Sequence, residues 1–197
     1  MTERDKVLNL LRGAVANRIR FTFPFRFGTV TIAGGSFTYV ANAIESGRVR
    51  LQITNTFPPG VGGQYTSGTP NTLRAAPLAG RVQEGLLLHE CTHAVFDLTR
   101  TKVTDNEDEA ACYVVNALYF RMTGLRPPRW NAEPHVTAGT VADDLLRKYQ
   151  AGKVPIPPVD AALWTNLRAT VALDPLYRWG TSGILGVLAG SETGHDG

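Results

Sequence analysis

The spacing of apolar residues changes along the N-terminal part of the chain. Over residues 4–17 apolar residues recur at helical intervals, which predicts a short amphipathic helix that ends near Gly13 or Asn17. Residues 18–32 instead alternate phenylalanine with polar residues, which is the pattern of a half-buried strand, and Pro24 favours a sheet edge or a bulge there. Further short strands are expected at 29–32, 36–40 and 48–53, with a helical turn at 41–47.

A segment rich in proline and glycine follows. Residues 57–69 predict a long loop, and residues 71–75 predict one more strand. The N-terminal part of the chain should therefore form a small, mostly antiparallel sheet. The strand at 71–75 is expected to be either an ordinary edge strand or, if the protein cleaves peptides, an edge that pairs with an extended substrate.

Helical spacing dominates the rest of the chain. Helices are expected at 82–99 and at 107–122, the second ending near Gly124. A third helix is expected at 136–149, entered through Thr137 or Thr140, and a last one at 160–172 after an extended stretch at 153–158. Strands followed by helices predict the α+β class.

The motif with the clearest chemistry lies in the first of these helices. His89, Glu90 and His93 form a His-Glu-x-x-His pattern inside the apolar run 86–98. Residues four apart share one face of a helix, so both imidazoles can bind one metal ion, with Glu90 beside it. The alternative is a helix with two partly buried histidines that bind nothing, although burying such groups without partners is costly.

The helix that follows offers the third ligand that a catalytic zinc ion usually has. Together with the motif, its Glu109-Ala110-Ala111-Cys112-Tyr113 segment resembles the gluzincin class of zincin metallopeptidases, in which a glutamate on this helix completes the site. The resemblance covers about residues 82–119. It implies a zincin-like domain over 1–180, followed by a glycine-rich tail at 181–197, and a Zn²⁺-dependent activity on peptides or proteins.

Two glutamates qualify as this ligand. Glu107 and Glu109 are two residues apart and lie on nearly opposite helix faces. Thr104 and Glu107 have capping-box spacing, which gives Glu107 a structural task and favours Glu109. A more distant resemblance to the ImmA/IrrE peptidases instead matches Glu107 with Ala110 and Tyr113.

Other parts of the expected site are less well defined. Where gluzincins have an aspartate four residues after the ligand, this chain has Tyr113, so the support of the ligands departs from the family. A weaker similarity to aspzincins involves Asp143. Asp97, one turn after His93, could either hold a ligand imidazole or pair with a nearby arginine, Arg100 or Arg121.

The resemblance gives Glu90 the role of general base, which takes a proton from a metal-activated water and delivers it to the leaving amine. A donor for the developing oxyanion is then needed. The candidates are His135, Tyr113 and Tyr149. His135 follows Pro134 in what we expect to be a loop, where it is either such a donor or an ordinary surface residue.

Composition narrows the possible partners and compartments. The net charge of +3 comes from scattered lysines and arginines, which argues against nucleic acid as a partner. The sequence predicts neither a signal peptide nor a membrane-spanning segment, so the cytoplasm is the default, with export by a signal-independent route left open. Cys91 and Cys112 are expected to be buried thiols. The alternatives are that they affect the metal or form a disulfide bridge between two helices.

Two alternative functions accompany the peptidase hypothesis. The same scaffold could bind a peptide or protein partner without cleaving it, although an intact Glu90 argues against a pure binder. It could also be an exported hydrolase that acts as a toxin or effector. The sequence determines neither the substrate nor the oligomeric state.

Overall fold

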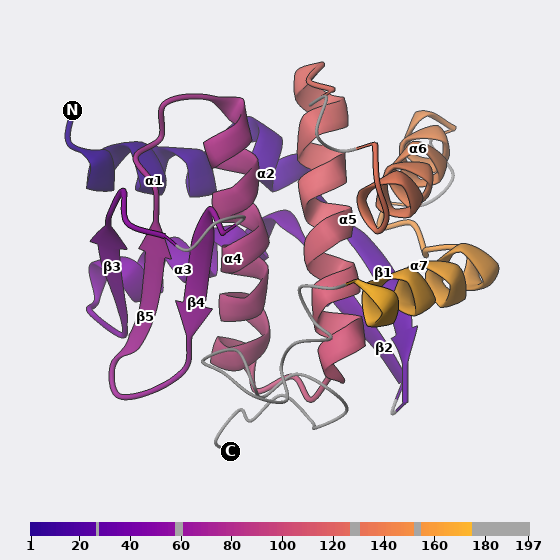
Figure 1. Cartoon of the computed structure of the whole chain (residues 1–197), viewed down its shortest axis with the longest axis horizontal. Helices are drawn as coiled ribbons and strands as arrows, with labels where there is room; N and C mark the ends of the chain where they lie inside the picture. The colour runs from indigo at the N-terminus through magenta and orange to yellow at the C-terminus, as the bar shows by residue number, and fades with distance from the viewer. Residues whose placement is uncertain (27, 58–60, 127–130, 152–154, 175–197) are drawn as a thin grey trace.

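The computed structural model of the chain describes residues 1–26, 28–57, 61–126, 131–151 and 155–174. Within these ranges the chain has α+β architecture, with two small sheets on either side of a central pair of helices (Figure 1). No helix in them combines the length and apolar character that a membrane crossing requires. The tail expected at 181–197 lies outside the described residues.

The N-terminal segment forms two helices and a hairpin. The single helix expected over 4–17 is divided at Gly13 into α1 (Glu3–Arg12) and α2 (Ala14–Arg18). The phenylalanine alternation gives β1 (Phe21–Phe25), which pairs antiparallel with β2 (Gly28–Ile32). Phe21 and Phe23 are buried on one face of this hairpin, as the alternation predicts.

The strand expected at 36–40 is wrong, because the chain there forms helix α3 (Gly34–Glu45). Its buried residues Phe37, Val40, Ala41 and Ile44 follow a spacing of three and four, so they share one helix face that packs into the core. The helical turn expected at 41–47 is the second half of this helix.

The second sheet has the strand order β3-β5-β4 and is mixed rather than mostly antiparallel. Strand β3 (Val49–Ile53) runs parallel to β5 (Asn71–Ala75), and β4 (Gly63–Thr66) runs antiparallel to it. The bounds expected for β5 are confirmed, but β5 is the central strand and cannot be the edge that accepts a substrate. The outer strand next to the helices is β4, which lies inside the segment expected to be a loop.

The two central helices form an antiparallel pair. Helix α4 (Arg81–Thr99) and helix α5 (Asp105–Thr123) are connected by residues 100–104. Helix α5 ends at Gly124, as expected, and this glycine adopts the left-handed conformation. Gly85 brings the helices close: a β-carbon there would lie 2.5 Å from Cε1 of Phe120. The pairing therefore aligns the motif face of α4 with the first turns of α5.

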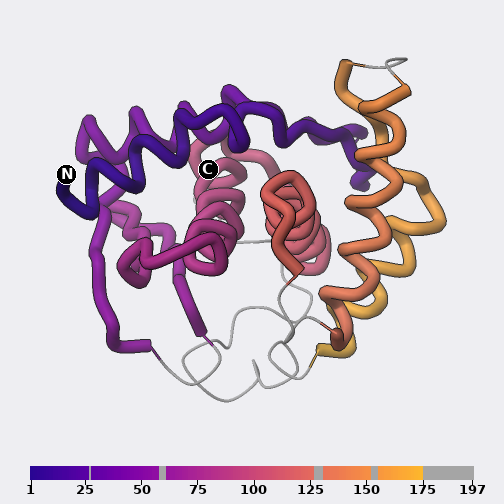
Figure 2. Tube along the Cα trace, turned by 90° about the horizontal axis from the view of Figure 1, so that it is seen from above, coloured from indigo at the N-terminus to yellow at the C-terminus, as the bar shows by residue number. Residues whose placement is uncertain are grey.

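Two further helices cover the outer side of α5. They are α6 (His135–Gln150) and α7 (Ala161–Leu173), and Asp160 caps the start of α7 by accepting hydrogen bonds from two backbone N–H groups. Figure 2 shows α4 and α5 nearly end-on, with α6 and α7 on one side and the three-stranded sheet on the other. Helix α6 begins at His135, after Pro134, so His135 lies at a helix start instead of in a loop.

Candidate metal centre

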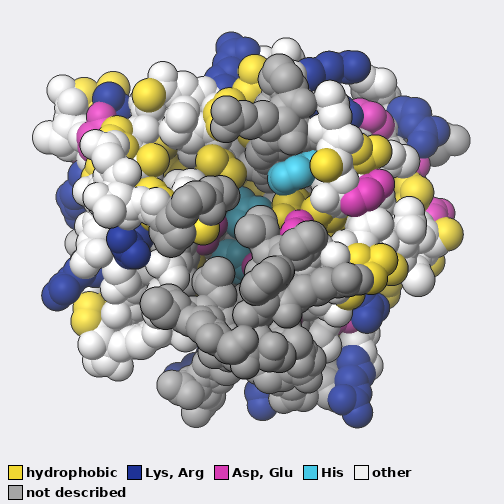
Figure 3. All heavy atoms as spheres, in the orientation of Figure 1, with side chains coloured by type: hydrophobic (Ala, Val, Ile, Leu, Met, Phe, Trp, Pro, Cys, Tyr) yellow, Lys and Arg dark blue, Asp and Glu magenta, His cyan; other side chains and the backbone are white. Residues whose placement is uncertain are grey.

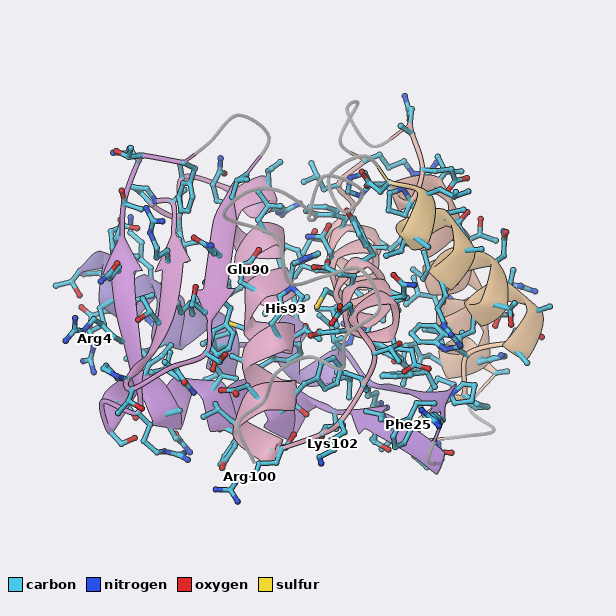
Figure 4. The ribbon with its side chains drawn as sticks, turned by 60° about the horizontal axis from the view of Figure 1, so that its bottom comes forward. Arg4, Phe25, Glu90, His93, Arg100 and Lys102 are labelled. Carbon is cyan, nitrogen blue, oxygen red and sulfur yellow. The ribbon has the colours of Figure 1, made fainter. Side chains whose placement is uncertain are left out.

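His93 projects from α4 toward α5 (Figure 4). Both motif histidines contact carboxylates of α5, His89 that of Glu109 and His93 that of Asp108. The ring centroids of His89 and His93 are 5.2 Å apart. Glu109 places Oε2 at 3.3 Å from Nε2 of His89 and Oε1 at 3.6 Å from Nε2 of His93. One carboxylate thus faces both imidazoles, each through a different oxygen.

The other carboxylates considered as ligands lie elsewhere. Glu107 accepts a hydrogen bond from the backbone N–H of Thr104 at 3.0 Å, and its other oxygen is 3.5 Å from Nη1 of Arg168. Asp143 accepts a hydrogen bond from Nε of Arg121 at 2.8 Å. Glu107 therefore stabilises the start of α5, and Asp143 belongs to an ion pair between α5 and α6.

Asp108 is a member of the cluster that was not predicted from the sequence. Its Oδ1 lies 2.7 Å from Nδ1 of His93, and the residue is almost completely buried. This contact leaves Nε2 as the ring nitrogen that faces Glu109. A signal was available in the sequence, because Asp108 precedes the favoured glutamate and lies four residues before Cys112, on the same helix face.

Cys112 also reaches the cluster. His89, His93 and Cys112 place one possible ligand atom each within 4.8 Å of one another, so this half-buried to buried group could hold a metal ion. Both Cys91 and Cys112 are free thiols, which contradicts the bridge considered between the two helices. Two donors are therefore available as a third partner of the imidazoles, the Cys112 sulfur and the Glu109 carboxylate.

The charge around the imidazoles is negative. Burial acts to lower the pKa of His93, but the surrounding acidic groups, with Asp108 first among them, outweigh burial and raise that pKa well above its ordinary value. The environment that favours an imidazolium equally favours a bound cation. The side chains of His89 and His93 remain 12% and 17% exposed, so solvent still reaches them. Figure 3 shows histidine side chains recessed near the middle of this face.

Glu90 lies beside the imidazoles and contacts the outer strand of the sheet. Its Oε2 accepts a hydrogen bond from the backbone N–H of Tyr65 on β4 at 2.8 Å. Burial raises the pKa of Glu90, while the two histidines and the Tyr65 amide act in the opposite direction. A β-carbon at Gly63 would lie 2.7 Å from Cγ of Glu90, so β4 packs closely on this side chain.

Asp97 connects α4 to the sheet. Its Oδ2 accepts hydrogen bonds from the hydroxyl of Tyr65 and from the side-chain amide of Asn71, each at 2.5 Å. From the sequence, Asp97 was expected either to hold a motif imidazole or to pair with Arg100 or Arg121. In the structure the carboxylate at hydrogen-bond distance from His93 is that of Asp108, and Asp97 fixes the strands beside α4.

Two aromatic rings extend the cluster toward α6. The ring of Tyr113 lies 5.3 Å from that of His89 and 4.9 Å from that of His135, measured between centroids. Burial, followed by the charge of His89, lowers the pKa of His135 to about 4, so its imidazole is neutral at physiological pH. Tyr149 lies apart from these rings, at a backbone N–H of Arg20, which donates to its hydroxyl at 3.0 Å.

Comparisons of the chain with protein-family models, with curated proteins and with solved structures give no match. The resemblance to gluzincins therefore rests on the residues of α4 and α5 alone.

Proposed function

We propose that this protein is a zinc-dependent metallopeptidase in which His89, His93 and Glu109 bind the ion. The observation that supports this most strongly is the position of the Glu109 carboxylate, 3.3 Å from one imidazole nitrogen and 3.6 Å from the other. From this position Glu109 would complete the His-Glu-x-x-His motif with the additional carboxylate ligand that is common in zinc hydrolases.

The residues fit the ion by donor type and by spacing. Zinc takes imidazole nitrogen and carboxylate oxygen at about 2.1 Å in tetrahedral geometry, which separates two ligands of one ion by about 3.4 Å. Each imidazole nitrogen lies close to this separation from a different oxygen of Glu109. Asp108 would support the site by accepting the Nδ1 proton of His93, which fixes the tautomer that binds through Nε2.

The protein's own residues then have defined tasks. A zinc ion held there would supply Lewis acidity, which lowers the pKa of a water ligand toward neutrality and polarises a carbonyl group. Glu90 would accept a proton next to the two imidazoles and later donate it to the leaving amine. The raised pKa of Glu90 makes it a stronger base for this transfer than an exposed carboxylate.

Neighbouring elements would orient the substrate. Strand β4 is the outer strand on the side of α4, so an extended peptide could pair with it. From the sequence this role was one of two expected for the strand at 71–75, which is β5. Tyr113 and His135 are the nearest candidates to donate a hydrogen bond to a developing oxyanion, because their rings continue from His89.

The proposal is tested by metal content and cleavage together. Protein purified in the presence of zinc and then dialysed should retain close to one zinc per chain, measured by mass spectrometry of the metal, and His89→Ala should abolish this binding. Glu90→Gln should keep the zinc but lose cleavage of a broad peptide library, because an amide cannot accept the proton.

Each outcome has a defined meaning. Wild-type protein that retains no zinc would refute the proposed site. Zinc-loaded protein that cleaves nothing in the library would refute the peptidase activity and favour the alternative of a scaffold that binds a peptide or protein without hydrolysis.

A further inference from the structure

Cys112 contacts two members of the cluster, Asp108 and the Nδ1 side of the His93 ring. Its Sγ is 3.5 Å from Oδ1 of Asp108 and 3.5 Å from Nδ1 of His93, and the residue is fully buried. The same Oδ1 of Asp108 is 2.7 Å from Nδ1 of His93. The thiol, the carboxylate and the imidazole therefore form a closed triangle at Nδ1 of His93.

We infer that Cys112 is a positioning residue for the metal site, which it serves by donating its S–H to Asp108. This inference rests on the proposed zinc site. Asp108 must present one oxygen in the plane of the His93 ring, and a carboxylate on the first turns of a helix can rotate about its side-chain bonds. The thiol, one helical turn later, binds that same oxygen and restricts the rotation.

The geometry favours this role over direct binding of the ion by sulfur. The sulfur lies next to Nδ1 of His93, whereas Nε2 faces Glu109 and His89 lies beside Glu109. An imidazole that binds zinc through Nε2 keeps its proton on Nδ1, where Asp108 accepts it. Sulfur on the Nδ1 side would therefore support this hydrogen bond, while Nε2 would bind the ion.

The first test compares zinc affinities of variants by competition with a chelator. Removing a direct hydrogen-bond partner of a ligand histidine typically weakens metal binding about 10- to 100-fold. Cys112 acts on His93 through Asp108, and a thiol is a weak hydrogen-bond donor, so its effect should be smaller. We therefore expect Cys112→Val to weaken zinc binding by about 3- to 10-fold. Cys112→Ser, which keeps a donor, should stay within about twofold of wild type.

Cys91→Val is the matched control, because Cys91 is also a fully buried free thiol. It should leave zinc affinity close to that of wild type. Equal losses in Cys91→Val and Cys112→Val would assign the effect to packing and overturn the inference, as would unchanged affinity in Cys112→Val.

A second test follows the hydrogen bond itself. In metal-free protein the Nδ1 proton of His93, observed by NMR of ¹⁵N-histidine, should shift and exchange faster in Cys112→Val but not in Cys112→Ser or Cys91→Val. An unchanged resonance would contradict the positioning role. This measurement needs no bound ion, so it judges the inference even if zinc binding, and with it the proposed function, fails.

Cobalt substitution separates positioning from direct ligation. The Co²⁺-loaded protein should lack a sulfur-to-metal charge-transfer band in the near ultraviolet, and Cys112→Ser should leave its visible spectrum nearly unchanged. A charge-transfer band that disappears in Cys112→Ser would show that sulfur binds the ion, as the proximity of Cys112 to both histidines also permits, and would overturn the inference.

Discussion

Gly63 and Glu90 are so close that a β-carbon on Gly63 would lie 2.7 Å from Cγ of Glu90. Cγ is near the base of the glutamate side chain, so a clash there cannot be relieved by moving the carboxylate alone. The absence of a side chain at position 63 is therefore what allows β4 to pack against the proposed general base.

Gly63→Ala is predicted to displace Glu90 and to reduce peptide cleavage by about 10- to 100-fold, since small misplacements of a catalytic group have effects of this size. Zinc content should not change, because the clash would fall on Glu90, which is not one of the proposed ligands. Gly62→Ala is the matched control: its β-carbon would meet only the end of the Leu86 side chain, which can rotate away. Equal loss of activity in both variants, measured as kcat/KM, would contradict this account.

Glu109→Ala is predicted to reduce zinc affinity, whereas Glu107→Ala is predicted to reduce stability. Loss of Glu109 should weaken zinc binding by at least about 100-fold, more than the loss of a residue that only supports a ligand. Loss of Glu107 should leave zinc affinity nearly intact and lower the free energy of unfolding by about 1–3 kcal/mol, since its hydrogen bond at the start of α5 is removed. Chelator competition and urea denaturation measure the two quantities. A reversed result would make Glu107 the ligand.

Asp108→Asn should weaken zinc binding by about 10- to 100-fold, because an amide holds the Nδ1 proton of His93 less firmly than a carboxylate does. Asp97→Asn serves as the comparison, since Asp97 bonds to Tyr65 and Asn71 on the strands. If both variants bound zinc like wild type, the contact between Asp108 and His93 would have no role in holding the ion.

Gly85→Ala should destabilise the protein by about 1–2 kcal/mol, although alanine is the better helix former. Its β-carbon would lie 2.5 Å from Cε1 of Phe120 and 2.9 Å from Nδ2 of Asn116, so α4 and α5 would have to separate. Gly35→Ala in α3 has open space around it and should instead stabilise by up to about 1 kcal/mol. Denaturant midpoints measure whether each variant is more or less stable than wild type. A stabilised Gly85→Ala would disprove the close packing.

His135 predicts a pH dependence of stability. Its pKa is lowered to about 4 in the folded protein, whereas the pKa of an unperturbed histidine in the unfolded chain is 6.5. Because the unfolded state binds more protons between these values, this contribution is present above the unfolded pKa and is lost as pH falls toward 4. Metal-free wild type should therefore lose about 1–2 kcal/mol more than His135→Gln between about pH 7 and about pH 5. Parallel pH profiles of the unfolding free energy would contradict this.

The sequence predicted the central helix pair well because its signals are local. The apolar run around the motif, the capping spacing of Thr104 and Glu107, and the terminal Gly124 act within a few residues of each helix. The choice of Glu109 over Glu107 rested on the capping-box spacing of Glu107 and on the opposite helix faces of the two residues, and the structure does bring Glu109 to the imidazoles. Its role as a ligand remains a prediction.

The errors arose where distant contacts decide the structure. Strand β4 lies in a segment rich in glycine and proline, and it forms because β5 and α4 lie on its two sides. The prolines and glycines of this segment predicted a loop instead of a strand. Similarly, Phe37 and Val40 fit a strand or a helix in a short window, and only their burial with Ala41 and Ile44 distinguishes the two. Asp108 was missed because its partner is on another helix.

The short connection between α4 and α5 has a consequence for how the cluster assembles. His89, His93 and Glu109 all belong to one helical hairpin, so little chain entropy is lost in bringing them together once the helices pair. A cation that binds them therefore adds its binding energy to a local unit of the fold, whereas Glu90 depends on β4, which reaches it from a separate part of the chain. Holding an ion and having the base in position are consequently properties that the protein can lose independently.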